Sequence, residues 1–166
     1  MVIAQNIADI KKNIPKGVKL VAVSKTKPAE LLMEAYQHGQ RAFGENKVQE
    51  MVWKYEELPK DIEWHLIGHL QTNKVKYIAP FVHLIHGVDT FRLLKAIDTE
   101  AQKVNRIIPF LLQFHIAEEE TKFGFSMDEA LEMLGSDEFG NLNNIRISVV
   151  MGKRGCCFFP IIFLFE

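Results

Sequence analysis

Apolar residues gather in short runs along the chain, and longer segments of helical periodicity separate these runs. Each run has the length of a strand and is continuously apolar instead of alternating with polar residues. Such strands are typical of a parallel sheet whose two faces are both covered. The predicted strands are Val18–Ser24, Arg41–Gly44, Ile62–Ile67, His83–Val88, Ile107–Ile116 and Ile145–Met151.

The segments between these runs show the three- and four-residue spacing of amphipathic helices. Glycine or proline follows most of them, as expected where a helix ends. The predicted helices are Ala29–His38, Val48–Glu57, Thr72–Ile78, Phe91–Val104 and Met127–Leu134. The repeated unit is therefore a strand followed by a helix, which indicates an α/β fold with a parallel sheet.

The turn after the first strand distinguishes between the two common forms of such a fold, an open doubly wound sheet and a barrel. An open dinucleotide-binding sheet carries a glycine-rich turn there, whereas this chain has Ser24–Pro28 without a glycine. A TIM-type (β/α) barrel is favoured. A complete barrel takes about 200–250 residues, so the six units in these 166 residues predict an incomplete one.

The composition argues against binding to nucleic acid or to a membrane surface. Hydrophobic residues make up 48% of the chain and charged residues 25%, with a formal charge of -1. This balance gives no basic field for nucleic acid or a membrane surface. The N-terminus does not resemble a signal peptide, and the two cysteines, Cys156 and Cys157, are adjacent. We therefore expect a cytoplasmic protein without a disulfide framework.

Lys25 is the first candidate for chemistry, because it follows a buried strand directly. Active sites of barrels lie at the carboxyl ends of the strands. A lysine amine reacts only when it is unprotonated, and its ordinary pKa is ~10.4, so it needs burial or a nearby cation to react near neutral pH. The alternative for a single lysine is a solvent-exposed residue at a strand end.

Four blocks of sequence, in order, closely resemble the pyridoxal phosphate homeostasis proteins: Val21–Pro28, Phe43–Glu50, Trp64–Lys74 and Glu120–Phe125. The resemblance covers roughly Met1 to Gly152. It implies a barrel similar to the N-terminal domain of alanine racemase, with pyridoxal 5'-phosphate held as a Schiff base on Lys25. It also implies a role in vitamin B6 homeostasis without robust turnover, in which apo-enzymes could receive the cofactor. The cofactor-binding residues that we expect are Lys25, Asn46, Ile67, Gly68, His69 and Met151.

Two further clusters suggest other chemistry less strongly. His65 and His69 have the four-residue spacing of helical zinc ligands, but Trp64–Ile67 reads as a strand and Gly68 breaks a helix. We therefore expect no metal site there. Glu118–Glu120 offers consecutive carboxylates, which point in different directions and are typical of a solvated loop.

The chain departs from the family after Gly152. The glycine- and serine-rich turns that hold the cofactor phosphate in the family are missing, and residues 153–166 form an atypical apolar tail. We expect domain boundaries of 1–152 for the barrel and 153–166 for the tail, and we interpret the tail as an out-of-frame ending or a natural short variant. Without the phosphate contacts of those turns we expect weaker cofactor binding. The open edges of an incomplete barrel favour self-association.

Three functions remain open. The first is a non-catalytic carrier of pyridoxal phosphate. The second is a pyridoxal-phosphate-dependent amino-acid racemase, which needs a second acid–base residue, typically a tyrosine. The chain has Tyr36, Tyr55 and Tyr77, all in helix-like segments. The third is a defective fragment with impaired cofactor binding.

Overall fold

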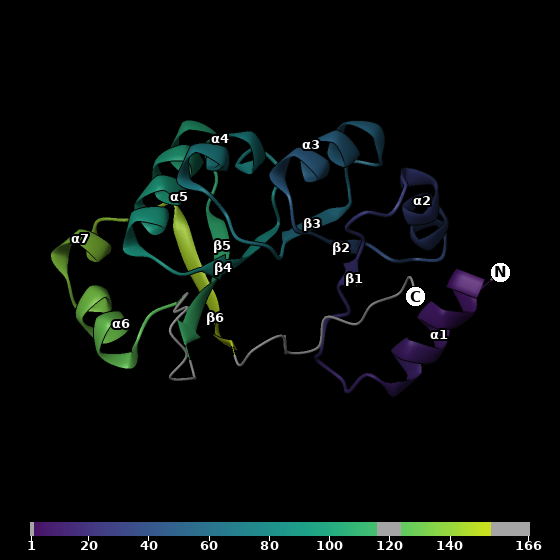
Figure 1. Ribbon diagram of the computed structural model, residues 1–166, viewed down its shortest axis with the longest axis horizontal. Coiled ribbons are helices and arrows are strands. Elements are labelled where there is room, and N and C mark those ends of the chain that lie inside the picture. Colours follow the sequence, from purple (N-terminus) through teal and green to yellow (C-terminus); the bar gives the residue numbers. More distant parts are fainter. Residues whose placement is uncertain (1, 116–123, 154–166) are drawn as a thin grey trace.

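The computed structural model describes residues 2–115 and 124–153, and this part of the chain forms one parallel sheet with helices packed against it (Figure 1). The sheet has the order β1-β2-β3-β4-β5-β6, so each strand pairs with the next strand along the chain. All five pairings are parallel. The strands are β1 (Ala22–Val23), β2 (Ala42–Glu45), β3 (Glu63–Leu66), β4 (Leu84–Val88), β5 (Ile108–His115) and β6 (Ile145–Lys153).

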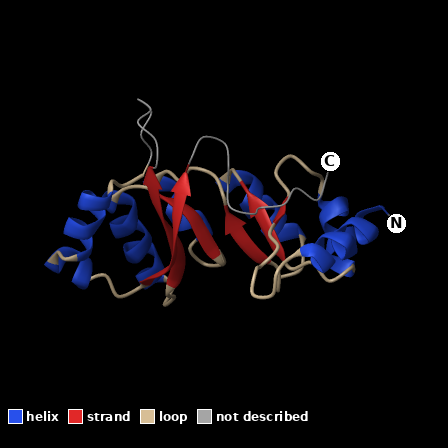
Figure 2. Ribbon diagram, turned by 90° about the horizontal axis from the view of Figure 1, so that it is seen from below, coloured by secondary structure: helices blue, strands red, loops and turns tan. Residues whose placement is uncertain are grey.

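The helices connect successive strands, and α2 to α5 lie along one side of the curved sheet (Figures 1 and 2). Crossovers of this kind are required between parallel neighbours. The helices are α1 (Val2–Asn13), α2 (Ala29–Gln37), α3 (Val48–Glu57), α4 (Val75–Ile78), α5 (Phe91–Lys103), α6 (Met127–Leu134) and α7 (Asp137–Gly140), and a 3-10 turn at Thr72–Lys74 precedes α4.

The main hydrophobic core lies between the sheet and these helices. Ala22, Phe43 and Trp64 stand in register on β1, β2 and β3, and Ile85 pairs with Phe110 across β4 and β5. These five side chains are completely buried and belong to one cluster with the apolar faces of the helices. Alternate residues of the strands therefore point away from the helices, toward the inner face of the sheet.

The predicted α/β architecture is confirmed, with shifts at the ends of elements. Helices α3 and α6 have the predicted bounds, and the other predicted strands and the remaining helices differ mostly by one or two residues. The first strand is much shorter than the predicted Val18–Ser24, because β1 pairs with β2 alone through two residues. The predicted helix Thr72–Ile78 is divided into the 3-10 turn and α4.

Two helices were not predicted. The N-terminal helix α1 carries Ile3, Ile7 and Ile10 at helical spacing, and Ile7 is 2% exposed. Helix α1 packs against α2. The short helix α7 begins after Ser136, whose hydroxyl accepts a hydrogen bond from the Phe139 N–H.

The sheet is an open segment of a barrel. Within the described residues, β1 and β6 each pair with a single neighbour. No helix in the described ranges is long and apolar enough to cross a membrane. Three predicted features lie outside the described residues: the end of the fifth strand at Ile116, the Glu118–Glu120 loop, and the apolar tail beyond Lys153.

Candidate functional site

The register of the first three strands brings the predicted site residues to one edge of the sheet. Val23 pairs with Gly44, and Gly44 pairs with His65. Two residues farther on, Lys25, Asn46 and Ile67 therefore stand side by side at the carboxyl ends of β1, β2 and β3. This edge corresponds to the active-site end of barrel folds.

Lys25 lies in a short turn that the end of β1 holds in place. The Ser24 N–H donates to the Gly44 carbonyl at 2.9 Å, which extends the ladder by one residue beyond the strand. Lys25 itself is partly buried. Thr26 follows with a φ of 63°, an uncommon left-handed conformation for a β-branched residue. The backbone before Lys25 is therefore fixed by a sheet hydrogen bond, and the backbone after it has a left-handed conformation.

Gly68 allows the turn after β3 to touch the turn after β2. A Cβ atom on Gly68 would lie 2.3 Å from the Asn46 carbonyl oxygen, so a side chain cannot fit there without moving the backbone. A Cβ on Gly44 would meet Ile67 at 3.2 Å and Val21 at 3.4 Å. Asn46, Ile67 and Gly68 thus form one close-packed group next to Lys25.

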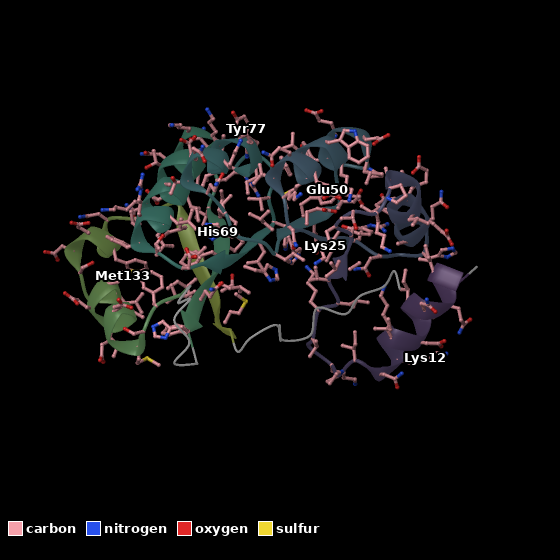
Figure 3. All side chains as sticks on the ribbon, viewed as in Figure 1. Lys12, Lys25, Glu50, His69, Tyr77 and Met133 are labelled. Atoms are coloured by element: carbon pink, nitrogen blue, oxygen red, sulfur yellow. The ribbon has the colours of Figure 1, made fainter. Side chains whose placement is uncertain are left out.

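His69 extends this group toward β4. Its Nδ1 lies 3.4 Å from Oδ2 of Asp89, and its side chain is 58% exposed whereas that of Asp89 is 6% exposed. Asp89 follows the end of β4 directly. The pair therefore links the turn after β3 to the turn after β4 at the same edge of the sheet; Figure 3 labels His69.

Met151, the sixth predicted residue, lies elsewhere. It is a buried residue of β6 and pairs in register with Gln113 of β5. Strands β4 and β5 lie between it and β3. The first three strands therefore bring five of the six predicted residues to neighbouring turns, while Met151 lies on β6 and its place in the site stays a prediction.

The structure adds a buried charged network behind Lys25 that the sequence reasoning missed. Lys54 of α3 and Glu45 of β2 have fully buried side chains, and their Nζ and Oε1 atoms are 2.8 Å apart. Lys54 Nζ also donates to Glu50 Oε1 at 2.8 Å and to the Ser24 carbonyl at 2.7 Å. Figure 3 shows Glu50 on the helical side of Lys25.

Two further hydrogen bonds connect this network to the Lys25 turn. The Ser24 hydroxyl donates to Glu45 Oε1 at 2.6 Å, and the Thr26 N–H donates to Glu50 Oε1 at 2.6 Å. The network thus holds the residue before Lys25 and the residue after it.

The two carboxylates of the network have opposite pKa shifts. Burial raises the pKa of Glu45, and the hydrogen bonds from Lys54 and Ser24 oppose this only in part. Burial also acts to raise the pKa of Glu50, but the hydrogen bonds from Lys54 and from the Thr26 backbone lower it overall. Glu50, at the more exposed side of the network, is therefore the more stable anion.

A sequence signal for Lys54 existed. Val48, Met51 and Lys54 are the buried residues of α3, and Lys54 is the single charged residue among these three. A lysine on an apolar stripe, four residues after a glutamate, indicates a buried ion pair.

The histidines do not form the helical pair that their spacing suggests. His65 lies on β3, with its Nδ1 2.9 Å from Nε2 of His86, whereas His69 lies in the turn beside Asp89. Burial, together with the charges of His86, His83 and Lys19, lowers the pKa of His65 to about 2. Burial lowers the pKa of His86 to about 4. Both imidazoles are therefore neutral near pH 7.

A different group, Glu63, His65 and His83, has ligand atoms within 4.8 Å of one another. It lies near the start of β3 and β4, at the opposite end of the strands from Lys25. Lys19 forms an ion pair with Glu63. A metal ion there would have to displace this ammonium from the carboxylate.

The three tyrosines are all engaged in the helical layer. The Tyr36 hydroxyl donates to Asp61 at 2.8 Å, and Tyr55 stacks on Phe81 with ring centroids 3.9 Å apart. Tyr77 is exposed on α4, on the outer side of the molecule (Figure 3). None of the three lies in the turns that surround Lys25.

Comparison with known proteins agrees with this arrangement. The family model of the alanine racemase N-terminal domain matches residues 2–156. The pyridoxal phosphate homeostasis protein of Aquifex aeolicus is 44% identical over 116 residues, which are 69% of this chain and 51% of that protein. That of Pasteurella multocida is 37% identical over 146 residues, or 80% of this chain and 63% of that protein. The chain belongs to the alanine racemase N-terminal domain family and, within it, to the pyridoxal phosphate homeostasis proteins.

Solved structures confirm the fold. PipY of Synechococcus elongatus with PLP bound superposes with a TM-score of 0.83 at 33% identity, over 94% of this chain and 72% of that one. Alanine racemase of E. faecalis gives a TM-score of 0.70 at 14% identity and shares the fold alone. The chain spans about half to two thirds of the length of the Aquifex aeolicus and Pasteurella multocida proteins.

Proposed function

We propose that this chain binds pyridoxal 5'-phosphate through a Schiff base on Lys25 and serves vitamin B6 homeostasis as a carrier without robust turnover. The observation that supports this most directly is the position of Lys25 at the carboxyl end of β1, beside Asn46 and the close-packed Gly68 turn. Membership of a family whose member PipY has been solved with PLP bound supports the same assignment.

The residues present fit such a ligand. The Lys25 amine would add to the aldehyde carbon, a C–N bond would form, and the carbonyl oxygen would leave as water. The Asn46 amide can donate or accept a hydrogen bond without adding charge. Gly68 keeps the neighbouring turn close to Asn46 without a side chain. The bound cofactor supplies the aldehyde and an electron-withdrawing ring.

The positions of the tyrosines favour a carrier over a racemase. Racemisation requires acid–base groups on both faces of the reacting carbon, and a tyrosine is the expected second group. Tyr36, Tyr55 and Tyr77 are occupied in or exposed on the helical layer. A carrier requires reversible attachment alone, and apo-enzymes that use the cofactor are the recipients that fit this role.

The direct test is attachment of the cofactor. We expect purified protein incubated with pyridoxal phosphate to gain a visible absorption band, and borohydride to fix the label on the peptide that contains Lys25. Lys25→Ala should abolish both. Lys47→Ala is the matched control, because Lys47 is an exposed lysine next to Asn46. A labelled Lys25→Ala protein, or an unlabelled wild type, would contradict the proposal.

Self-association through the open sheet is a separate part of the proposal. Strands β1 and β6 each have one side without a neighbouring strand among the described residues. Open strand edges pair readily with another chain. Light scattering across a range of protein concentrations should show a mass that rises above that of one chain, whereas a constant monomer mass would reject this part.

A further inference from the structure

We infer that Lys54 is a positioning residue for Lys25: it fixes the backbone on both sides of the reactive lysine and thereby sets the direction of its amine. The effect of Lys54 on the reaction of Lys25 with the cofactor rests on the proposed function. The contacts of Lys54 with the Lys25 turn do not depend on any ligand. We thereby assign a role to a buried ammonium group that contacts the Lys25 turn through the Ser24 carbonyl.

The ammonium group of Lys54 has a hydrogen-bond acceptor for each of its three donors. A lysine has three N–H donors and no acceptor. Lys54 Nζ has three acceptors within 2.8 Å, namely the Ser24 carbonyl, Glu45 Oε1 and Glu50 Oε1. The side chain of Lys54 is 0% exposed. Each donor therefore has one partner, and the arrangement leaves the ammonium a single orientation.

The partners of Lys54 hold the two peptide groups of Lys25. The Ser24 carbonyl belongs to the peptide bond that joins Ser24 to Lys25. On the other side, Glu50 Oε1 accepts the Thr26 N–H at 2.6 Å, and that nitrogen belongs to the peptide bond after Lys25. Both peptide groups of Lys25 are thus bonded, directly or through one carboxylate, to the same ammonium.

The network holds Thr26 in a left-handed backbone conformation. Thr26 has a φ of 63°, which costs free energy for a β-branched residue and persists where the surroundings enforce it. The hydrogen bond from Thr26 to Glu50 is a specific contact that does so. A fixed backbone restricts the directions in which the Lys25 side chain can leave the turn, and such restriction favours reaction with a bound partner.

The experiment removes the buried charges together. Lys54→Met with Glu45→Gln eliminates the ammonium and its fully buried carboxylate partner, so neither is left uncompensated. Glu57→Gln, on the exposed side of the same helix, is the matched control. Circular dichroism and thermal unfolding establish that each variant is folded.

Two readouts are measured on the folded proteins. The first, without any ligand, is hydrogen exchange of the Thr26 amide, which should accelerate at least about tenfold in the double variant. The Ile67 amide, bonded to the Glu45 carbonyl at 2.9 Å, reports on global opening and should not change. The second is the rate at which borohydride traps pyridoxal phosphate on the Lys25 peptide, which should fall by about tenfold.

A folded double variant with wild-type exchange at Thr26 would overturn the inference, as would faster exchange with undiminished trapping at Lys25. If the double variant does not fold, Glu50→Ala takes its place, because it removes the acceptor of the Thr26 N–H at the more exposed edge of the network. A wild type that is never trapped at Lys25 refutes the proposed function, and Thr26 exchange alone then decides whether Lys54 holds the turn.

Discussion

Nδ1 of His65 lies 2.9 Å from Nε2 of His86, and both rings are buried on the inner face of the sheet, on neighbouring strands. One nitrogen of this contact must carry the hydrogen and the other must accept it. Two protonated imidazoles would have no acceptor between them and would repel each other. The contact therefore requires that at least one ring be neutral.

Acid should destabilise the fold because of this pair. The pKa of His65 is lowered to about 2 and that of His86 to about 4, whereas both titrate near pH 6.5 in an unfolded chain. Between about pH 4 and 6.5 the unfolded state binds more protons, so the free energy of unfolding rises with pH in this window, by up to about 1.4 kcal/mol per pH unit for each histidine. Above about pH 7 the two histidines should change the free energy of unfolding little. Urea unfolding at several pH values measures this slope.

The double variant His65→Phe with His86→Leu tests how much these two histidines contribute to the pH dependence of stability. It removes both imidazoles, so its stability should depend less steeply on pH between 4 and 6.5 than that of the wild type. Its stability at pH 7.5 gives the packing effect separately. An unchanged slope would show that other groups cause the acid sensitivity.

Gly68→Ala should destabilise the protein and disturb Asn46. The added Cβ would lie 2.3 Å from the Asn46 carbonyl oxygen, and backbone displacement of this kind costs about 1–3 kcal/mol. Chemical denaturation measures the loss. Gly140→Ala is the matched control, since a Cβ there meets nothing within 4 Å. Equal effects of the two substitutions would refute the close contact as the cause.

Asp98→Ala should loosen the attachment of the last strand. Asp98 Oδ1 accepts a hydrogen bond from the Asn144 N–H at 2.7 Å, next to the start of β6. Losing a hydrogen bond to a charged acceptor costs about 1.5–3 kcal/mol. We expect lower resistance to urea and faster amide exchange in β6. Asp98→Asn, which keeps an acceptor oxygen, should lose less, and Glu132→Ala on the exposed face of α6 should have little effect.

Asn46→Ala should weaken retention of pyridoxal phosphate without unfolding the protein. Asn46 is partly buried and stands in register beside Lys25, and an amide side chain can donate or accept a hydrogen bond. Loss of one hydrogen bond worth about 1 kcal/mol corresponds to roughly a fivefold weaker affinity. Spectroscopic titration measures the affinity, with Lys47→Ala as the neighbouring control. A wild-type affinity in Asn46→Ala would remove this residue from the proposed site.

The sequence predicted the parts of the site that depend on strand ends. An apolar run predicts where a strand stops, and parallel pairing then places the residues that follow, which is why Lys25 and Asn46 were found together. The short β1 was not predicted, because the length of a ladder depends on its partner: Leu20 and Val21 are buried as an apolar run should be, yet they lie before the paired residues.

The buried charges were harder to predict. The apolar stripe of α3 and the spacing of Glu50 and Lys54 indicate a buried ion pair, but tertiary packing alone shows that the end of β2 and the Lys25 turn enclose Lys54. The same holds for His65, whose partner comes from the next strand. Met151 lies on β6, and its place in the site stays a prediction.

The strictly sequential order of the sheet has a consequence for how the chain folds. Each strand finds its partner in the segment made just before it, so every pairing closes a loop of one helix and its connections. Contacts of short sequence separation form quickly, and the fold can grow from the N-terminus during synthesis. The turn that carries Lys25 and the Lys54 network that holds it can form once residue 54 has been synthesised, before most of the sheet exists.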